Sequence, residues 1–336
     1  MNNILVTGGA GFIGRNLVEM LTLQGAQVSV IDYAQSEWSA KNFRELRKNR
    51  RVRLLERVDI RSREQVSVVL RTCEPEMVIH LAAESHVDKS IAAPYKFIES
   101  NILGTHSLLE AVFEHWEETK RPAGFRFLYC STDEVYGSID EDSFQESMPV
   151  CPLNPYSATK ASGEHLVTAW LNTYGLPGVI TRCSNNYGQY QGADKLVPLT
   201  IGRCLRLEPV LLHGDGKNVR DWIHVADHCR GILDVLRYGT DGEAYNIGGG
   251  QDYECTNEQI VQMICDLCSE LTDQTDRHKL ITHVMDRAGN DRRYSMNTDK
   301  LRSLSSWHPK VALNAGLRET VQWYIDNQHY CRKVEP

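Results

Sequence analysis

The 336-residue sequence predicts an α/β protein built on a doubly wound parallel sheet, with a second, smaller α/β domain. Two observations support this prediction. Up to residue 185, short apolar runs bounded by turns alternate with longer segments of helical periodicity, which is typical of a parallel sheet covered by helices on both faces. From about residue 186 this alternation breaks down, and glycine and proline become frequent. We therefore assign residues 1–185 to the first domain and most of residues 186–336 to the second.

The expected strands are apolar without a clean polar/apolar alternation, as in a sheet that is buried on both faces. They cover residues 4–7, 27–33, 52–58, 77–83, 125–131 and 178–183. Helical periodicity separates these strands at residues 13–23, 39–48, 63–72, 94–116 and 156–174, and a last helix is expected at 315–326.

Composition excludes several classes of protein. Lysine and arginine total 37 and aspartate and glutamate total 44, so the formal charge is −7, which disfavours an extended nucleic-acid partner. No apolar stretch approaches the roughly 18 residues that span a bilayer, so no membrane partner is expected. The chain begins directly in a strand without a leader pattern, which predicts a cytoplasmic protein.

The ten cysteines are spread along the chain, several within apolar runs, which is the pattern of reduced thiols rather than of a disulfide framework. Cys265 and Cys268 form a Cys-x-x-Cys pair inside a helical segment at 260–267, and no second pair follows at zinc-binding spacing. His224 and His228 are one helical turn apart, but they also lack an evident third ligand. We therefore expect no metal site.

A glycine-rich turn follows the first strand and opens the first helix, which is the context in which a dinucleotide is bound. Gly8 permits a tight turn, Gly11 lets the backbone approach a pyrophosphate at the helix N-terminus, and Gly14 allows helix and strand to pack closely. Asp32 ends the second strand, where a carboxylate suits the ribose hydroxyls of NAD and repels the additional phosphate of NADP. Together these features predict a Rossmann-type domain that binds NAD.

Tyr156 and Lys160 lie four residues apart in a predicted helix that Asn154 caps and Pro155 begins. This spacing places both side chains on one helix face. A neighbouring ammonium group favours the phenolate, so the tyrosine becomes usable as a base nearer neutral pH.

Two adjacent acids, Asp133 and Glu134, follow Thr132 where the strand at 125–131 ends. Open α/β sheets bind their ligands at the carboxyl ends of the strands. Paired carboxylates in different environments can serve as one acid and one base. The pattern alone also fits two solvated loop acids.

Over nearly its whole length the chain resembles the nucleotide-sugar 4,6-dehydratases, a branch of the extended short-chain dehydrogenase/reductase family. The resemblance includes the Gly-x-x-Gly-x-x-Gly turn, the Tyr-x-x-x-Lys pair and the sequence Ser-Thr-Asp-Glu-Val-Tyr-Gly at 131–137. Further matching stretches lie at 81–90, 183–188, 194–198, 214–222, 245–249 and 286–294. The resemblance implies conversion of dTDP-glucose to its 4-keto-6-deoxy form with NAD. UDP-glucose as the substrate, a sugar epimerase and a non-catalytic NAD-binding regulator remain alternatives.

The resemblance also implies a role for each reactive side chain. Tyr156, assisted by Thr132 and Lys160, removes the C4 hydroxyl proton while NAD+ takes the C4 hydride. Glu134 then removes the C5 proton, Asp133 protonates the departing C6 hydroxyl, and hydride returns to C6.

Ligand contacts follow from the same resemblance. Residues expected at the cofactor are Gly8, Gly11, Phe12, Ile13, Gly14, Asp32, Asp59, Ile60, Leu81, Ala82, Ala83, Ser100, Tyr156, Lys160 and Asn186. Residues expected at the substrate are Ser85, His86, Thr132, Asn185, Lys195, Leu196, His213, Arg220, Arg287 and Asn290. The cations among them suit a diphosphate.

A few positions near the nucleotide end depart from the family pattern. His213 stands where tyrosine is common, Ala288 and Asn290 interrupt the usual Asp-Arg-Pro-Gly-His-Asp stretch, and Cys255 replaces an asparagine. These changes leave the dehydration chemistry intact and the nucleotide base open.

In the family the substrate domain is interleaved, so segments around 225–248 should return to the first domain. Family members commonly dimerise through a helix bundle, for which residues 94–116 and 156–174 are the candidates.

Overall fold

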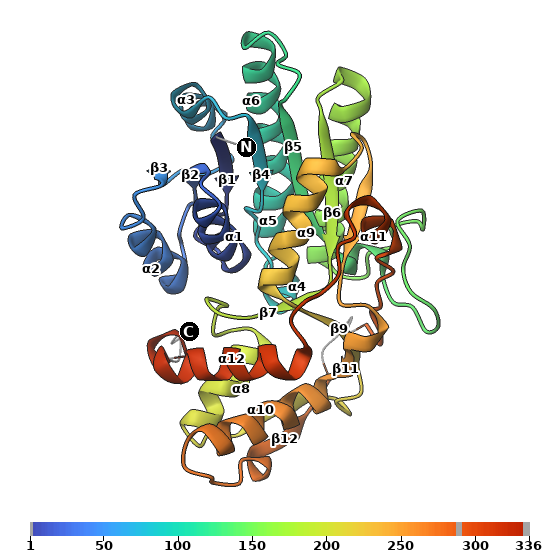
Figure 1. Ribbon diagram of the computed structural model, residues 1–336. Helices are drawn as coiled ribbons and strands as arrows, with labels where there is room; N and C mark the ends of the chain where they lie inside the picture. The colour runs from blue at the N-terminus through green and yellow to red at the C-terminus, as the bar shows by residue number, and fades with distance from the viewer. Residues whose placement is uncertain (1–2, 287–290, 332–336) are drawn as a thin grey trace.

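The computed structural model describes residues 3–286 and 291–331 (Figure 1). A seven-stranded parallel sheet runs through the larger part of the chain in the order β10-β6-β5-β4-β1-β2-β3. Its strands are β1 (Asn3–Thr7), β2 (Gln27–Ile31), β3 (Val52–Glu56), β4 (Met77–His80), β5 (Arg126–Thr132), β6 (Gly178–Cys183) and β10 (Ala244–Ile247). The strand order reverses between β1 and β4, which is the arrangement of a doubly wound sheet and confirms the predicted fold class.

Helices cover both faces of this sheet (Figure 1). One face packs against α1 (Phe12–Leu23), α2 (Glu37–Leu46), α9 (Val225–Tyr238) and α11 (Asp299–Ser305), and the other against α3 (Arg63–Cys73), α6 (Gly104–Glu118) and α7 (Pro155–Tyr174). Because neighbouring side chains of a strand point to opposite faces, Val6 lies in the first core and Leu5 in the second. Both are fully buried, which explains why the strand segments lack polar alternation.

The expectation of one continuous helix over residues 94–116 is wrong. This segment comprises α5 (Pro94–Phe97), a π-helix η1 (Ile98–Leu103) and then α6, and α4 (Val87–Ala92) precedes it. In η1, the amide of Asn101 exchanges two hydrogen bonds with the backbone of Glu84, at 2.8 and 2.9 Å. The wider turn brings Asn101 to this loop after β4, and such π-segments are frequent at functional sites.

The second unit lies beyond the carboxyl ends of the sheet strands (Figure 1). Its strands are β7 (Asn185–Tyr187), β8 (Val210–His213), β9 (Val219–His224), β11 (Glu254–Thr256) and β12 (Ile281–Val284), and its helices are α8 (Leu196–Leu205), α10 (Asn257–Leu271) and α12 (Leu313–Asp326). Short helical turns are η2 (Asp133–Tyr136), η3 (Gln251–Tyr253), η4 (His278–Leu280) and η5 (Gln328–Tyr330). Cys265 and Cys268 are fully buried in the core of this unit.

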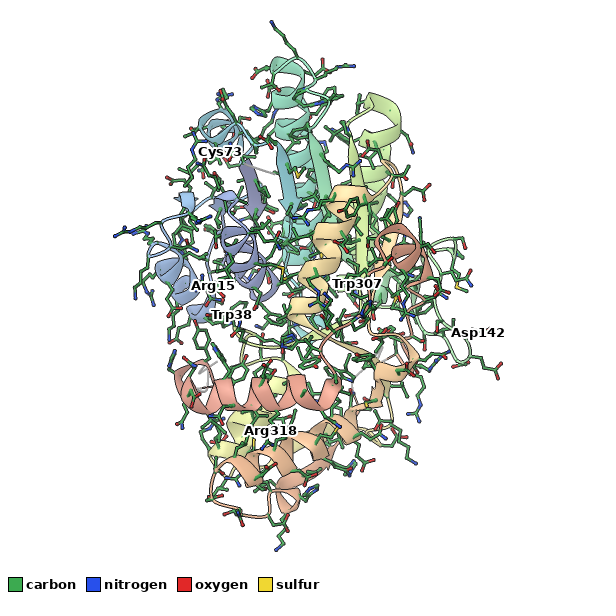
Figure 2. All side chains as sticks on the ribbon, in the orientation of Figure 1. Arg15, Trp38, Cys73, Asp142, Trp307 and Arg318 are labelled. Atoms are coloured by element: carbon green, nitrogen blue, oxygen red, sulfur yellow. The ribbon has the colours of Figure 1, made fainter. Side chains whose placement is uncertain are left out.

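The two units are interleaved along the chain. α9 and β10 return to the large sheet, and α11 with Trp307 also packs on its core, which the sequence pattern did not assign. From the other side, Trp38 of α2 packs against the core of the second unit (Figure 2). In the part of the chain that the structure describes, no helix is long and apolar enough to cross a membrane.

Candidate active site

The glycine-rich turn after β1 is shaped for close backbone approach. Gly8 has a φ of +70°, and a Cβ atom there would lie 2.6 Å from the backbone nitrogen of Ala82. A Cβ on Gly14 would lie 2.1 Å from the carbonyl oxygen of Gly8. Gly11 precedes α1, and no side chain caps this helix. The first backbone N–H groups, beginning at Phe12 and Ile13, can therefore bind an anion. This cradle fits the pyrophosphate of NAD.

Asp32 follows β2 and joins two loops at this cradle. Its Oδ2 atom accepts a hydrogen bond from the backbone N–H of Ala10 at 2.9 Å, and its Oδ1 atom accepts one from Ala34 at 2.7 Å. Burial raises the pKa of Asp32, and these backbone hydrogen bonds oppose the rise. Each carboxylate oxygen retains a second lone pair, so the residue can still accept from ribose hydroxyls.

Asp59 and Ile60, which are expected at the cofactor, lie in the loop after β3. Arg61 donates from its guanidinium to both carboxylate oxygens of Asp59, at 3.1 Å to Oδ1 and 2.6 Å to Oδ2. Burial alone would raise the pKa of Asp59, but the hydrogen bonds from Arg61 lower it overall. Ile60 is buried beneath this pair, where a Cβ atom on Gly104 would be 2.9 Å away. Ser100 is half-buried in η1.

The segment Leu81, Ala82 and Ala83 leaves β4 beside the glycine turn. The backbone N–H of Ala82 donates to the hydroxyl of Thr7 at 3.2 Å. His80, which the motifs did not single out, is buried between the hydroxyls of Thr7 (2.8 Å) and Thr105 (3.0 Å). Burial, and then the charge of Lys160, lowers the pKa of His80 to about 3, so a neutral imidazole ties the strand ends together.

The Thr132-Asp133-Glu134 sequence turns from β5 into η2. Thr132 donates to Asp133 Oδ1 at 3.1 Å and accepts from the backbone N–H of Glu134 at 3.3 Å. Burial, and then the negative charges of Glu134 and Asp221, raises the pKa of Asp133 well above its usual range. Asp133 Oδ2 is buried without a hydrogen-bond partner among the described residues, which suits a group that faces a ligand. Asp133 is therefore set up as a proton donor.

Asn154 connects Glu134 to the start of α7. Its Oδ1 atom accepts from the backbone N–H of Ser157 at 2.9 Å, which caps the helix. With Oδ1 so engaged, its Nδ2 atom donates to Glu134 Oε2 at 3.3 Å. Glu134 is half-buried, and its carboxylate is thus held by the residue that begins the helix of Tyr156.

Tyr156 and Lys160 both lie on the buried side of α7, the face on which their spacing places them. The ammonium of Lys160 donates to the carbonyl oxygen of Cys130 at 2.7 Å and lies 4.2 Å from the ring centre of Tyr129. Burial, and then the negative charge of Glu134, raises the pKa of Tyr156 well above its usual range. Lys160 is thus hydrogen-bonded at β5, and its effect on the Tyr156 phenol stays a prediction.

The residues expected at the substrate join loops from both units. Lys195 donates to the carbonyl oxygen of Ser85 at 2.6 Å, and His86 lies 3.7 Å from the carboxylate of Asp194. Burial, and then the charge of Lys195, lowers the pKa of His86.

The remaining substrate candidates divide into buried and exposed groups. Asn185 begins β7, and its Oδ1 atom is buried without a hydrogen-bond partner among the described residues. Leu196 is half-buried against the core of the second unit, whereas His213 is exposed at the end of β8. Arg287 and Asn290 lie outside the described residues.

Arg220 on β9 lies in a buried polar layer with Asp221 and Tyr294, two residues that the sequence motifs did not single out. Its guanidinium donates to the carbonyl oxygen of Asp291 at 2.9 Å and lies 4.5 Å from the ring centre of Tyr294. The adjacent Asp221 accepts from the backbone N–H groups of two consecutive glycines, at 2.7 and 3.1 Å. Burial raises the pKa of Asp221 to about 7. Asp221 and Tyr294 both lie within stretches that carry the family resemblance, at 214–222 and 286–294, and that is the signal in the sequence that marks them.

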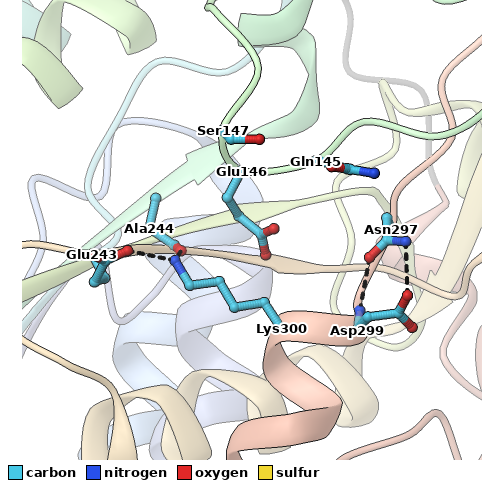
Figure 3. A pocket seen from close by; sticks show the side chains of 8 residues that line it. All are labelled: Gln145, Glu146, Ser147, Glu243, Ala244, Asn297, Asp299 and Lys300. Carbon is cyan, nitrogen blue, oxygen red and sulfur yellow. Dashed lines mark hydrogen bonds and ion pairs between the residues drawn. The ribbon is translucent and has the colours of Figure 1, made fainter.

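A cavity of about 470 Å3 lies apart from this constellation (Figure 3). It is lined by Gln145, Glu146, Ser147, Glu243, Ala244, Asn297, Asp299 and Lys300. Lys300 donates to Glu243 at 2.6 Å, and Asn297 donates to Asp299 at 3.0 Å. The cavity contains no residue of the predicted site.

Comparison with known proteins places these features in a family context. A family model described as GDP-mannose 4,6 dehydratase matches residues 5–320. The dTDP-glucose 4,6-dehydratase of Neisseria meningitidis serogroup B is 43% identical over 99% of this chain and 96% of its own. The solved DesIV dTDP-glucose 4,6-dehydratase of Streptomyces venezuelae, with NAD bound, has a TM-score of 0.85 at 40% identity, covering 97% of this chain and 98% of its own. A UDP-glucose 4-epimerase from Thermotoga maritima has the same TM-score, 0.85, at 30% identity, covering 98% of this chain and 100% of its own. The fold therefore does not by itself distinguish the two activities.

Proposed function

The chain belongs to the GDP-mannose 4,6 dehydratase family, and from this premise we propose that it is an NAD-dependent hydro-lyase that converts dTDP-glucose to dTDP-4-keto-6-deoxyglucose. The observation that carries the proposal is the pair Asp133 and Glu134 at the end of β5. One acid is buried with a raised pKa, and the other is half-buried and held by an amide. Removal of water needs such a division, because one group must donate a proton while another accepts one.

Each step has a group of this chain suited to it. Tyr156 on α7 accepts the C4 hydroxyl proton, assisted by Lys160 on the same helix and by Thr132 at the end of β5. NAD+, held by the glycine turn and Asp32, would supply the acceptor of the C4 hydride and later the donor of hydride to C6. The C4 ketone acidifies the C5 proton, which Glu134 accepts, and Asp133 donates a proton to the leaving C6 hydroxyl. Return of a proton to C5 completes the product.

The charges on the second unit are proposed to hold the nucleotide diphosphate. Lys195 and Arg220 provide the positive charge among the described residues, and Asn185 supplies an amide. Arg287 remains a prediction for the same role, and Asn290 remains a predicted substrate contact. A diphosphate suits such a group because charge-assisted hydrogen bonds to phosphate oxygens are strong and directional.

The test is incubation of the purified chain with dTDP-glucose or with UDP-glucose, followed by mass spectrometry of the sugar nucleotide. We expect dTDP-glucose to lose one water. Preferential water loss from UDP-glucose would change the nucleotide assignment, and an epimer of unchanged mass would indicate the epimerase. Recovery of both sugars unaltered would contradict catalysis.

A Glu134→Gln variant tests the assignment of the base. We expect this variant to oxidise C4 and accumulate NADH absorbance without losing water, because the amide cannot accept the C5 proton. The exposed loop acid Glu141 provides the matched control, Glu141→Gln, which should behave as wild type. Product formation by Glu134→Gln at the wild-type rate would overturn the assignment.

We propose that the protein is a homodimer formed through α6 and α7. The two helices share an aromatic cluster in which His106 and Trp170 are 5.5 Å apart, Phe113 and Tyr174 are 5.2 Å apart, and Tyr174 is 45% exposed. A second copy packing on these helices would cover that exposed apolar surface. Light scattering at micromolar concentration should give the mass of a dimer, and a monomer would refute the assignment.

We also propose a cytoplasmic location. All ten cysteines are free thiols, which is the state that a reducing compartment maintains. Fractionation of the source cells should recover the activity in the cytosol, and recovery outside it would exclude this location.

A further inference from the structure

Three ligand-type side chains meet behind the candidate active site. They are Cys130 on β5, Cys183 at the end of β6 and His228 on α9, exposed by only 7%, 8% and 0%. Their Sγ and imidazole nitrogen atoms all lie within 4.8 Å of one another, and Cys130 Sγ is 4.0 Å from His228 Nε2. Within the described part of the chain, no other group of three histidine, cysteine or acidic side chains reaches this geometry.

The hydrogen bonds around His228 determine which ring nitrogen faces the sulfurs. Asn186 Nδ2 donates to the carbonyl oxygen of Ser184 at 2.9 Å, so its Oδ1 atom faces His228 Nδ1, also at 2.9 Å. Because that oxygen accepts only, Nδ1 carries the proton and the Nε2 lone pair points toward the thiols. Metal-binding histidines are commonly fixed in this way, by donation of the other ring N–H to an oxygen.

The sheet register argues against a direct disulfide between the two cysteines. Cys130 pairs with Thr181 and Cys183 pairs with Thr132, so the cysteines are offset by two residues on neighbouring strands. Strand rise and spacing then put their Cα atoms roughly 8 Å apart, beyond the limit of about 7 Å for a disulfide in an unmoved backbone. An ion that bonds to both sulfurs at about 2.3 Å can bridge a wider separation.

We propose that Cys130, Cys183 and His228 form a buried binding site for one thiophilic divalent cation of the zinc and cadmium class. Two thiolates and one neutral imidazole are the ligands such cations prefer, and oxygen-seeking ions such as Mg2+ do not match them. Binding releases the two thiol protons, so the two thiolates balance the dication and no net charge is added to the interior. The site lies directly behind Thr132 and Asn186, and it is independent of the dehydratase assignment.

The test uses Cd2+ as the probe on the full-length chain as purified, in a non-thiol reductant. We expect one retained Cd2+ by native mass spectrometry, with a thiolate-to-cadmium ultraviolet band that Cys130→Val and Cys183→Ala each abolish. Cadmium NMR of the wild-type chain should report two sulfur ligands and one nitrogen, which avoids reliance on the folding of any variant.

Two other thiol groups provide matched controls. Cys204 and Cys265 are buried with their sulfur atoms 3.7 Å apart, and Cys151 is exposed. Cys265→Ala and Cys151→Ser should retain the band and the stoichiometry. Absence of retained Cd2+, a cadmium NMR signal without mixed sulfur and nitrogen ligation, or a band that survives Cys130→Val but disappears in Cys265→Ala would overturn the proposal.

Discussion

Asn154 has two functions that a matched pair of substitutions can separate. Its Oδ1 atom caps α7 through the N–H of Ser157, and its Nδ2 atom donates to Glu134 at 3.3 Å. Asn154→Asp keeps an oxygen at the cap but replaces the donor to Glu134 with a like charge. Asn154→Ala removes both interactions. We expect Asn154→Ala to lower the stability of the protein and Asn154→Asp to change the pH dependence of the reaction.

The magnitudes follow from these contacts. Loss of the cap in Asn154→Ala should lower the free energy of unfolding by about 1 kcal/mol, whereas aspartate remains a good capping residue. Two like charges 3.3 Å apart repel by about 1 kcal/mol in water and about 5 kcal/mol at an effective dielectric constant of 20. Because Glu134 is half-buried, we take about 1–3 kcal/mol, which raises its pKa by about 1–2 units.

The assay is the pH profile of dehydration, measured as kcat/KM for water loss from dTDP-glucose. If Glu134 is the base, the acid limb of the Asn154→Asp profile should move to higher pH by about 1–2 units. Asn154→Ser, which restores the cap without a charge, should keep the wild-type limb and serves as the control. An unchanged limb in Asn154→Asp would refute the coupling between Asn154 and Glu134.

Further predictions concern the cofactor turn, a buried acid and a buried ion pair. Gly14→Ala puts a Cβ atom 2.1 Å from a carbonyl oxygen of the same turn, so we expect loss of co-purifying NAD and a lower Tm. In the control Gly124→Ala the new Cβ atom meets no atom within 4 Å, so this variant should keep its NAD and the wild-type Tm. Burial raises the pKa of Asp221 to about 7 from 3.8, so the folded state holds more protons between these pH values, and the free energy of unfolding falls as pH rises through them, by at most about 1.4 kcal/mol per pH unit. Urea titrations at a series of pH values should show that this fall with pH is smaller in Asp221→Asn. An unchanged dependence on pH would exclude Asp221 as its origin. Arg182 donates to Glu164 at 2.7 Å within the core, so Arg182→Leu should lower the free energy of unfolding by about 3–5 kcal/mol. The double variant that also carries Glu164→Leu should recover much of this stability. An equal loss of stability in the single and the double variant would contradict a penalty from the unpaired charge.

Local sequence predicted the elements on which the site is built. The parallel sheet, the glycine turn after β1 and the capping of α7 by Asn154 all depend on neighbouring residues, so their patterns are visible along the chain. The continuous helix at 94–116 could not be judged in this way. Its π-segment depends on Asn101 reaching the backbone of Glu84, and no local propensity encodes that contact.

Side-chain partners within the site were the least predictable part. The spacing of Tyr156 and Lys160 places them on one face, but the packing of α7 on β5 directs the ammonium to the carbonyl oxygen of Cys130. Asp221 carries no motif of its own, and its raised pKa results from complete burial. Burial of a charge depends on what surrounds it in three dimensions, so these effects appear only in the folded chain.

The sequence by itself determined the fold class, the family and the chemical types of the reactive groups, because periodicity and motif order are properties of the linear chain. Tertiary structure decided which groups are neutral, which are hydrogen-bonded and which meet. Cys130, Cys183 and His228 are far apart in sequence and share no recognisable ligand spacing, yet β5, β6 and α9 bring their side chains within 4.8 Å of one another. Strand pairing and helix packing create such proximity, and both depend on contacts between distant segments of the chain.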